Sequence, residues 1–223
     1  MPDPSSVQSL FTDLAPSYDR YNRIFSLGLD TLWRKRLVQA MADRHPSTVL
    51  DVACGSGDVA LALQKALPAS KVTGLDFCAP LLAQAQARGL KTTVQGDALD
   101  LPFPDQSFSA VTLAFGLRNF SDRSKGLSEI DRVLQPGGVF GLLEFSPPPM
   151  PWKIFWDLYL HRIMPSVAQL LTRQGDSFRY LAQSISKFPD QKNLTCELAI
   201  AGFQTNYFQT MAGGLVTLNL GRK

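Results

Sequence analysis

The stretch DVACGSGDVA, residues 51–60, holds the residues whose types and spacing are best suited to chemistry. From Gly55 onward the letters GSGDVA match the pattern G-x-G-x-x-G/A, in which the glycines let the backbone approach a bound nucleotide closely. This pattern alone is a weak signal, and it is compatible with NAD or FAD. The ligand must therefore be decided by the other residues of this stretch and of the chain.

Two carboxylates in the same stretch argue against a dinucleotide. The pyrophosphate of a dinucleotide would lie at the N-terminus of the helix after the glycines, where the Asp58 side chain would repel it. S-adenosylmethionine has no phosphate, and carboxylates such as Asp51 and Asp58 would stabilise its sulfonium and α-ammonium groups. The alternatives are that Asp58 only caps its helix and that Asp51 only binds loop backbone.

Further acids follow the next two predicted strands. Asp76 lies near the end of the second strand, and Asp97 lies just past the third. In an open parallel sheet, ligands bind outside the carboxyl ends of the strands, so these acids and Asp51 are expected at one site. An acid at the position of Asp76 suits hydrogen bonds to a ribose diol, but it does so in NAD enzymes and in S-adenosylmethionine enzymes alike.

Alternating apolar segments predict the elements that position these residues. Strands are predicted at 48–53, 71–77, 91–95, 108–114 and 139–145, and helices between them at 59–67, 81–88 and 124–134. Strands that alternate with helices of about ten residues imply parallel βαβ units in a doubly wound α/β sheet with helices on both faces. Before the first strand, residues 10–41 have helical spacing broken by Pro16 and Gly28, which predicts N-terminal helices.

The order of elements changes after Pro147. Residues 147–187 have a helical pattern rich in large aromatic side chains, and late strands are predicted at 205–210 and 215–220 around a glycine pair. These two strands predict a closing hairpin, which a dinucleotide-binding fold does not need. A chain of 223 residues with 45% hydrophobic content is expected to form one domain.

The composition excludes several partners and sites. With a net charge of +3 and no block of Lys or Arg, no nucleic-acid partner is expected, and the triplet Arg34-Lys35-Arg36 is expected on a solvated helix face. The three cysteines lie far apart without metal-ligand spacing, so neither disulfides nor a metal site are expected. Without a signal peptide or an apolar run of about 18 residues, the chain is expected to be soluble and cytoplasmic, with peripheral membrane contact left open.

Motifs along nearly the whole chain give a more specific indication. The sequence resembles the class I S-adenosylmethionine methyltransferases, and among them it is similar to the menaquinone/ubiquinone biosynthesis C-methyltransferase family. The segments that carry the resemblance are YDRYNRIFSLGLDTLWRKR, LDVACGSGD, GDALDLPFPDQSFSAVTLAFGLRNFSD, RVLQPGGVFGLLEFS and SFRYLAQSISKFPDQ. FGLRN followed by LEFS is more specific than the glycine elements. The resemblance implies a Rossmann-like, mostly parallel seven-stranded sheet with an antiparallel C-terminal hairpin.

The resemblance also implies a cofactor site for S-adenosyl-L-methionine. Residues 55–57 would surround the methionine part, Asp76 would hold the ribose, and residues 97–98 would lie along the adenine. The complete set expected at the cofactor is Asp51, Gly55, Ser56, Gly57, Asp76, Phe77, Asp97 and Ala98. Asp30 departs from the family pattern, because a histidine is common at this position, and this departure leaves the details of the N-terminal segment open.

Methylation of a quinol ring carbon needs electron density on that carbon, which comes from weakening or removing the proton of a ring hydroxyl. Arg118 and Asn119 follow the fourth predicted strand, where the arginine could stabilise the oxyanion and the asparagine could orient a hydroxyl or a water. Tyr18, near the N-terminus, is the third catalytic candidate. The alternatives are loop bracing for Arg118 and Asn119, core packing for Tyr18, and His161 as the general base.

The expected protein is a single domain, 1–223, with an N-terminal helical lid at about 7–42 and a substrate-side helical insertion at about 147–188. The resemblance implies C-methylation of a prenylated quinol, in first place demethylmenaquinol to menaquinol. Demethylphylloquinol and a ubiquinone-pathway benzoquinol are close alternatives, and an NAD-dependent oxidoreductase or a non-catalytic cofactor-binding subunit are distant ones. The aromatic insertion would either hold the prenyl tail or only pack, and homodimerisation is left open.

Overall fold

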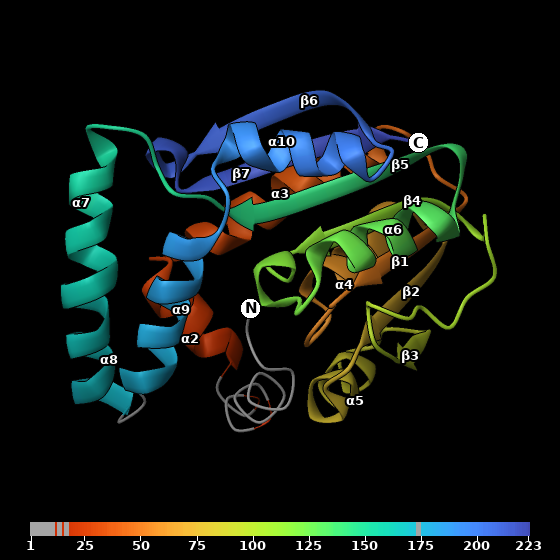
Figure 1. The fold of residues 1–223 in the computed structure, drawn as a ribbon. Helices are drawn as coiled ribbons and strands as arrows, with labels where there is room; N and C mark the ends of the chain where they lie inside the picture. The colour runs from red at the N-terminus through yellow and green to blue at the C-terminus, as the bar shows by residue number, and fades with distance from the viewer. Residues whose placement is uncertain (1–11, 13–14, 16–17, 173–174) are drawn as a thin grey trace.

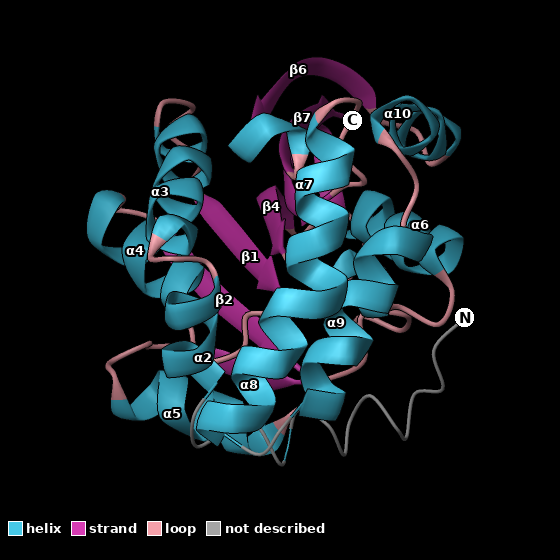
Figure 2. Ribbon diagram, turned by 90° about the vertical axis from the view of Figure 1, so that its left-hand side faces the viewer, coloured by secondary structure: helices cyan, strands magenta, loops and turns pink. Residues whose placement is uncertain are grey.

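The protein is built on a seven-stranded sheet with helices on both faces (Figures 1 and 2). The computed structural model describes residues 12, 15, 18–172 and 175–223. The strands lie in the order β3-β2-β1-β4-β5-β7-β6. Their bounds are β1 Thr48–Val52, β2 Lys71–Asp76, β3 Thr93–Gln95, β4 Phe108–Ala114, β5 Leu134–Phe145, β6 Gln204–Met211 and β7 Val216–Arg222.

The first five strands are parallel, and the last two close the sheet as a hairpin. β1 pairs in parallel with β2 and β4, while β7 runs antiparallel between β5 and β6. This arrangement confirms the predicted α/β fold and its C-terminal hairpin. Gly213 and Gly214 turn the hairpin with positive φ, and a Cβ on Gly214 would lie 2.5 Å from Cδ of Pro149. Glycine is therefore required at that turn.

Each face of the sheet packs against its own helices, which produces two hydrophobic cores. Val49 of β1 belongs to one core and the next residue, Leu50, to the other. Burial on both faces explains why these strands have nearly continuous apolar sequences. The first core includes residues of α3 Leu29–Ala42, α4 Asp58–Ala66 and α5 Ala79–Ala87. The second includes residues of α6 Arg123–Val133 and α10 Gln191–Ile200.

A further group of helices lies at the edge where the parallel strands end (Figures 1 and 2). These helices are α2 Tyr18–Phe25, α7 Trp152–Leu158, the π-helix η3 Tyr159–Ile163, α8 Met164–Thr172 and α9 Gly175–Lys187. Short 3-10 segments are η2 Leu117–Asn119 and η4 Ala212–Gly214. The helices of this group and α3 confirm the helical patterns predicted for residues 10–41 and 147–187, as far as the structure describes them, whereas α10 was not predicted. None of the described helices is long and apolar enough to cross a membrane.

Candidate active site

The glycine loop joins the end of β1 to the start of α4. Its backbone has positive φ at Ala53, Gly55 and Gly57. A Cβ on Gly57 would lie 3.0 Å from Cβ of Ala85, so a side chain there would be strained by the conformation and crowded by α5. The loop thus allows α4 and α5 to pack closely. Its residues Ala53 and Gly55 remain in the wall of a cavity at the strand ends.

A cavity of about 320 Å³ lies beside this loop, and we call it the strand-end cavity. Of the residues expected at the cofactor, those that line it are Gly55, Asp76, Phe77, Asp97 and Ala98. Its volume is in the range of small-molecule sites, and mostly apolar walls with a few polar groups are typical of such sites. The strand-end rule therefore brings together residues that lie far apart in the sequence.

Asp76 ties the glycine loop to the end of β2. Its Oδ2 accepts a hydrogen bond from the Gly55 N–H at 2.8 Å, and its Oδ1 accepts one from the Cys78 N–H at 2.8 Å. The residue is only 4% exposed, and this burial raises the pKa of its carboxyl group. Each carboxylate oxygen can accept more than one hydrogen bond, so the group retains acceptor capacity toward a diol in the cavity.

Asp97 and Ala98 form another part of the cavity wall, past the end of β3. The Asp97 side chain is exposed, and its Oδ1 accepts a hydrogen bond from the Leu99 N–H at 2.9 Å. Ala98 is half-buried and packs against the second core. The wall is therefore polar at Asp97 and apolar at Ala98, which suits a flat aromatic base with polar edges.

Asp51 is buried at the end of β1 and lines a different space. Its Oδ1 accepts a hydrogen bond from the Thr112 hydroxyl at 2.6 Å, while its buried Oδ2 has no hydrogen-bond partner among the described residues. Burial raises the pKa of this carboxyl group to about 7. Asp51 and Ser56 line a small polar cavity of about 30 Å³, whose wall also includes Gly55. Gly57, the N-cap of α4, lines neither of these cavities.

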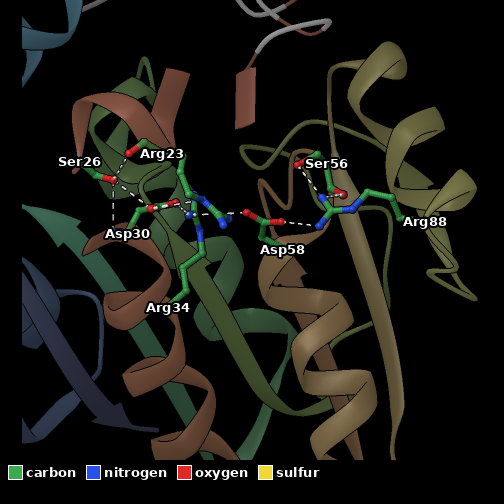
Figure 3. A network of polar contacts seen from close by, with 7 residues as sticks. All are labelled: Arg23, Ser26, Asp30, Arg34, Ser56, Asp58 and Arg88. Carbon is green, nitrogen blue, oxygen red and sulfur yellow. Dashed lines mark hydrogen bonds and ion pairs between the residues drawn. The ribbon is translucent and has the colours of Figure 1, made fainter. Parts of the chain in front are cut away.

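The ion pairs around Asp58 correct two expectations. Asp58 pairs with Arg88 at 2.6 Å and with Arg34 at 3.6 Å, so two guanidinium groups offset the charge on which the argument against a pyrophosphate partly rested (Figure 3). The expectation that Arg34 lies on a solvated helix face is wrong, since its side chain is only 13% exposed. Its neighbours Lys35 and Arg36 are exposed, as expected. The three residues differ because they lie on different sides of α3, and only Arg34 lies on the side that faces Asp58.

A third cavity, the aromatic cavity, has a volume of about 110 Å³ and lies among α2, α3 and the 147–188 segment. Its wall contains Trp33, Phe115, Phe145, Trp156 and Tyr159. Phe115 also lines the strand-end cavity, so the two spaces share one side chain as a wall. An apolar molecule in the aromatic cavity would therefore meet a cofactor in the strand-end cavity near Phe115.

Among the described residues, Arg118 is one of two arginines in the wall of the aromatic cavity, the other being Arg34 of α3. Its Nη1 donates a hydrogen bond to Oε1 of Glu144 at 2.9 Å and another to the Phe115 carbonyl. Glu144 is fully buried, and its Oε2 accepts the Arg118 backbone N–H at 3.2 Å. The buried Nε of Arg118 has no hydrogen-bond partner among the described residues. The guanidinium is therefore held at Nη1 and keeps a donor for a ligand.

Asn119 and Tyr18 occupy different positions. Asn119 lines the strand-end cavity, and its Oδ1 accepts a hydrogen bond from the Tyr180 hydroxyl at 3.0 Å. Burial raises the pKa of this hydroxyl. Tyr18 begins α2, but its side chain lies outside the described part of the structure. His161, the alternative general base, is exposed and bonds Ser186, and it does not line the aromatic cavity.

Sequence reasoning did not find Glu144, Arg34 or Tyr180. Glu144 had a visible signal, because a carboxylate inside the apolar strand VFGLLEF must have a partner when the strand is buried. Arg34 had a weaker one, the i, i+4 spacing from Asp30. For Tyr180 the sequence holds no such signal, since its partner Asn119 is distant in the chain.

Comparison with known proteins places the chain among its relatives. The model of the ubiE/COQ5 methyltransferase family matches residues 2–223. The chain belongs to this family. It is similar to the demethylmenaquinone methyltransferase of Thermus thermophilus, at 41% identity over 218 residues that cover 95% of this chain and 99% of the relative. The enzyme of that name from Lactiplantibacillus plantarum is 40% identical over 230 residues, with coverage of 98% and 96%.

Solved structures confirm the fold. An S-adenosylmethionine-dependent methyltransferase from Thermotoga maritima superposes with a TM-score of 0.69 at 17% identity, covering 96% of this chain and 99% of that one. One from Aquifex aeolicus has a TM-score of 0.61 at 17% identity, with coverage of 100% and 99%. The family and the fold together make this chain an S-adenosylmethionine-dependent methyltransferase.

The site fits this cofactor on its own chemistry. Asp51 offers a buried acceptor without a partner to a cationic ligand, and Asp76 faces the strand-end cavity with spare acceptor capacity. A phosphate at the same place would meet these acids at short range. S-adenosylmethionine supplies a methyl group activated on a sulfonium. The protein must bind it, orient an acceptor toward the methyl group, and exclude water.

Proposed function

We propose that this protein methylates a ring carbon of a prenylated quinol, in first place demethylmenaquinol to give menaquinol. The names of the relatives at 41% and 40% identity support this substrate class. The observation that carries the proposal is Arg118, a cation held by the buried Glu144 in the wall of an aromatic cavity that shares Phe115 with the strand-end cavity. A phytyl naphthoquinol and a ubiquinone-pathway benzoquinol have the same ring chemistry and remain alternative substrates.

The cofactor residues keep the roles expected from the sequence. Asp76 receives the ribose hydroxyls, residues 97–98 lie along the adenine, and Phe77 covers the same part of the strand-end cavity. Residues 55–57 and Asp51 surround the methionine part. This division agrees with the positions of Asp76 and Phe77 on the strand-end cavity and of Asp51 on the polar cavity.

Arg118 stabilises the oxyanion of the ring as negative charge develops on it. Because Nη1 is already bound to Glu144 and to the Phe115 carbonyl, the donors for this task are the remaining N–H groups of the guanidinium. A fixed donor in a water-poor cavity contributes more to the rate than the same donor in water. Glu144 is a positioning residue, since it is fully buried and does not line the aromatic cavity. Asn119 and Tyr18 orient the hydroxyl or a water that carries its proton.

The prenyl tail leaves the aromatic cavity between α7 and the turn from α2 to α3. Phe155, Leu27 and Leu29 line this cavity and are also 56%, 77% and 38% exposed, so its apolar wall continues onto the surface. Ile154 and Leu158 extend the exposed apolar surface along α7. This surface rests on the membrane that holds the tail, as expected for an interfacial helix without a spanning segment. Trp156 is part of the wall, and its Nε1 is held by a hydrogen bond to the Ala212 carbonyl at 3.0 Å.

The substrate is tested by the quinones of a strain that lacks this protein. The proposal expects a demethylated naphthoquinone to accumulate and the parent gene to restore menaquinone. The Arg118→Ala gene should not restore it. Accumulation of a phytyl naphthoquinone or of a benzoquinone would move the substrate to one of the two alternatives. An unchanged quinone pool would contradict the proposed function.

A further inference from the structure

The polar cavity joins an N-terminal helix to the glycine loop and carries opposite charges on its walls. Arg34 of α3 lines one side, and Asp51 of β1 lines another. Asp58 of α4 is a second acid in this wall, next to Gly55 and Ser56 of the glycine loop. A cavity with a cation and an unpartnered carboxylate oxygen matches a ligand that itself carries one charge of each sign on neighbouring atoms.

The position of Arg34 is fixed on three sides. Nη1 donates a hydrogen bond to Oδ2 of Asp30 and lies 3.6 Å from Oδ2 of Asp58 (Figure 3). The guanidinium carbon lies 5.5 Å from the centre of the Phe115 ring. A guanidinium has five N–H donors, and the one side-chain hydrogen bond that Arg34 makes with the described residues is donated by Nη1. Donors of a held guanidinium thus remain for a ligand in the polar cavity.

The charges around Arg34 do not cancel. Asp30 and Asp58 face three guanidinium groups, since Arg88 pairs with Asp58 at 2.6 Å and Arg23 approaches Asp30 at 3.9 Å (Figure 3). Burial of Asp30, at 4% exposure, keeps its own pairing with Arg34 out of bulk water. Because Arg88 lies closer to Asp58 than Arg34 does, Asp58 is paired mainly outside the polar cavity, and Arg34 faces the buried acceptor of Asp51 across it.

We propose that Arg34 and Asp51 form the subsite for the amino acid end of S-adenosylmethionine, with Arg34 binding the α-carboxylate and Asp51 the α-ammonium. This inference rests on the proposed placement of the methionine part at residues 55–57. Its new element is Arg34. The N-terminal segment then does more than cover the substrate, because α3 supplies a side chain to the cofactor. Arg34 also lines the aromatic cavity, so cofactor and substrate share this residue.

A purely structural role for Arg34 predicts a different behaviour. If Arg34 only linked α3 to α4 through Asp30 and Asp58, its loss would lower stability and would weaken all cofactor-like ligands together. A carboxylate subsite instead predicts loss of affinity only for ligands that have the carboxylate. The two readings are separated by the ratio of affinities for two ligands that differ in this one group.

The test is calorimetric titration with S-adenosylhomocysteine and with its decarboxylated analogue, which keeps the amine and lacks the carboxylate. The parent protein should bind S-adenosylhomocysteine roughly ten- to a hundredfold more tightly than the analogue, the range for hydrogen bonds to charged groups. Arg34→Met should bring the two affinities within about threefold, because only the carboxylate ligand is weakened. Arg34→Lys should give an intermediate ratio, since a lysine keeps the charge but loses the planar fork.

Arg88→Met is the matched control. Arg88 belongs to the same network, through Asp58 and Ser56, but it does not line the polar cavity. Its loss should leave the ratio of the two affinities as in the parent. Melting curves confirm that each variant is folded, and Arg34→Lys decides the test if Arg34→Met does not fold.

The outcomes separate the subsite from the proposed function. Equal weakening of both ligands in the folded Arg34 variants would overturn the subsite, as would a parent protein that does not prefer S-adenosylhomocysteine. Failure of the parent protein to bind either ligand would instead contradict the placement of the cofactor on which the inference rests.

Discussion

The strand-end cavity and the aromatic cavity lie against each other but are built in different ways. The strand-end cavity is lined by residues 53–121, which follow the first four strands of the parallel sheet. The aromatic cavity is lined by α2 and α3, by the distant 147–188 segment, and by Phe115 and Arg118 after β4. The parallel sheet thus builds the strand-end cavity by a general rule of α/β folds, whereas the aromatic cavity depends on helices outside the parallel sheet. Changes at residues that line one cavity alone should therefore affect mainly the function of that cavity, whereas Phe115 and Arg34 each lie in the walls of two cavities.

The largest expected effect concerns Glu144, the buried carboxylate behind Arg118. Glu144→Gln removes the charge partner of a guanidinium that is 7% exposed, and breaking such a pair should cost about 3 to 5 kcal/mol of unfolding free energy. The control is Glu197→Gln at the pair with Arg123, whose side chains are 28% and 31% exposed. That pair should contribute about 0 to 1 kcal/mol. Urea unfolding of both variants measures the contrast, and equal losses would show that Arg118 does not depend on Glu144.

Arg118→Ala tests whether the aromatic cavity holds the catalytic donor. Loss of an oxyanion donor should lower kcat roughly a hundredfold or more and should change KM much less, since the interaction grows in the transition state. Affinity for S-adenosylhomocysteine should stay within about threefold of the parent. Methyl-transfer kinetics give kcat and KM, and calorimetry gives the affinity for S-adenosylhomocysteine. A near-normal kcat in the folded variant would end the catalytic assignment, and a parallel loss of cofactor affinity would move Arg118 to the cofactor site.

Asp76→Ala tests the strand-end cavity, and here the loss is expected in cofactor affinity more than in the rate of methyl transfer. Removing the acceptor expected at the ribose should weaken the binding of S-adenosylhomocysteine by about 1.5 to 3 kcal/mol. The maximal rate at saturating cofactor should fall much less, because Asp76 does not line the aromatic cavity. Calorimetry with the variant and with an Asp97→Ala variant compares a buried acceptor with an exposed one. Unchanged affinity in Asp76→Ala would remove Asp76 from the cofactor site.

The pH dependence of cofactor affinity tests Asp51. Burial raises the pKa of this group to about 7, and a bound ammonium favours its carboxylate form. Affinity should therefore change little just above pH 7, where the ligand's ammonium is still protonated, and should fall by up to tenfold per pH unit below pH 7, as Asp51 takes up a proton. Asp51→Asn should bind more weakly and lose this slope. A slope that persists in Asp51→Asn would assign the titration to another group.

Membrane contact is the smallest expected effect. Ile154→Ser with Leu158→Ser removes side chains that are 64% and 53% exposed on α7 and do not line the aromatic cavity. Flotation with neutral vesicles should show reduced binding, because the buried apolar area decreases. Ile200→Ser, at an 84% exposed position on α10, is the control and should bind like the parent. Equal flotation of all three proteins would contradict contact through α7.

The parts of the molecule differ in how far the sequence predicts them. Asp76 and Asp97 were found because alternation of strands and helices fixes which loops meet at one edge of the sheet. The hairpin was found because Gly213 and Gly214 separate two short apolar runs. The same reasoning placed Arg34 on a solvated face, because sequence periodicity does not show that the glycine loop lies beside α3. Contacts such as Tyr180 with Asn119 depend on packing between distant segments, which no local pattern contains.

Asp30 lies at a position where the family resemblance implies a histidine, and its contacts explain what an acid does there. Its carboxylate is buried and bonds both Ser26 and Arg34, with the Ser26 hydroxyl at 2.9 Å from its Oδ1. An acid at this position neutralises part of the positive charge of the largely buried Arg34 side chain. Asp30 thus belongs to the network of Figure 3, through which α3 contacts Asp58 at the start of α4.

The central claim is that the two cavities together deliver a methyl group to a quinol carbon. It is tested most directly by incubating the protein with S-adenosylmethionine carrying a 13C-labelled methyl group and a short-chain demethylnaphthoquinol under reducing conditions. The product is then analysed by NMR. The account predicts a labelled methyl group bonded to the free ring carbon beside a hydroxyl, and none when the ring is supplied as the oxidised quinone. A label on oxygen, or no transfer to the quinol by a protein that binds the cofactor, would contradict it.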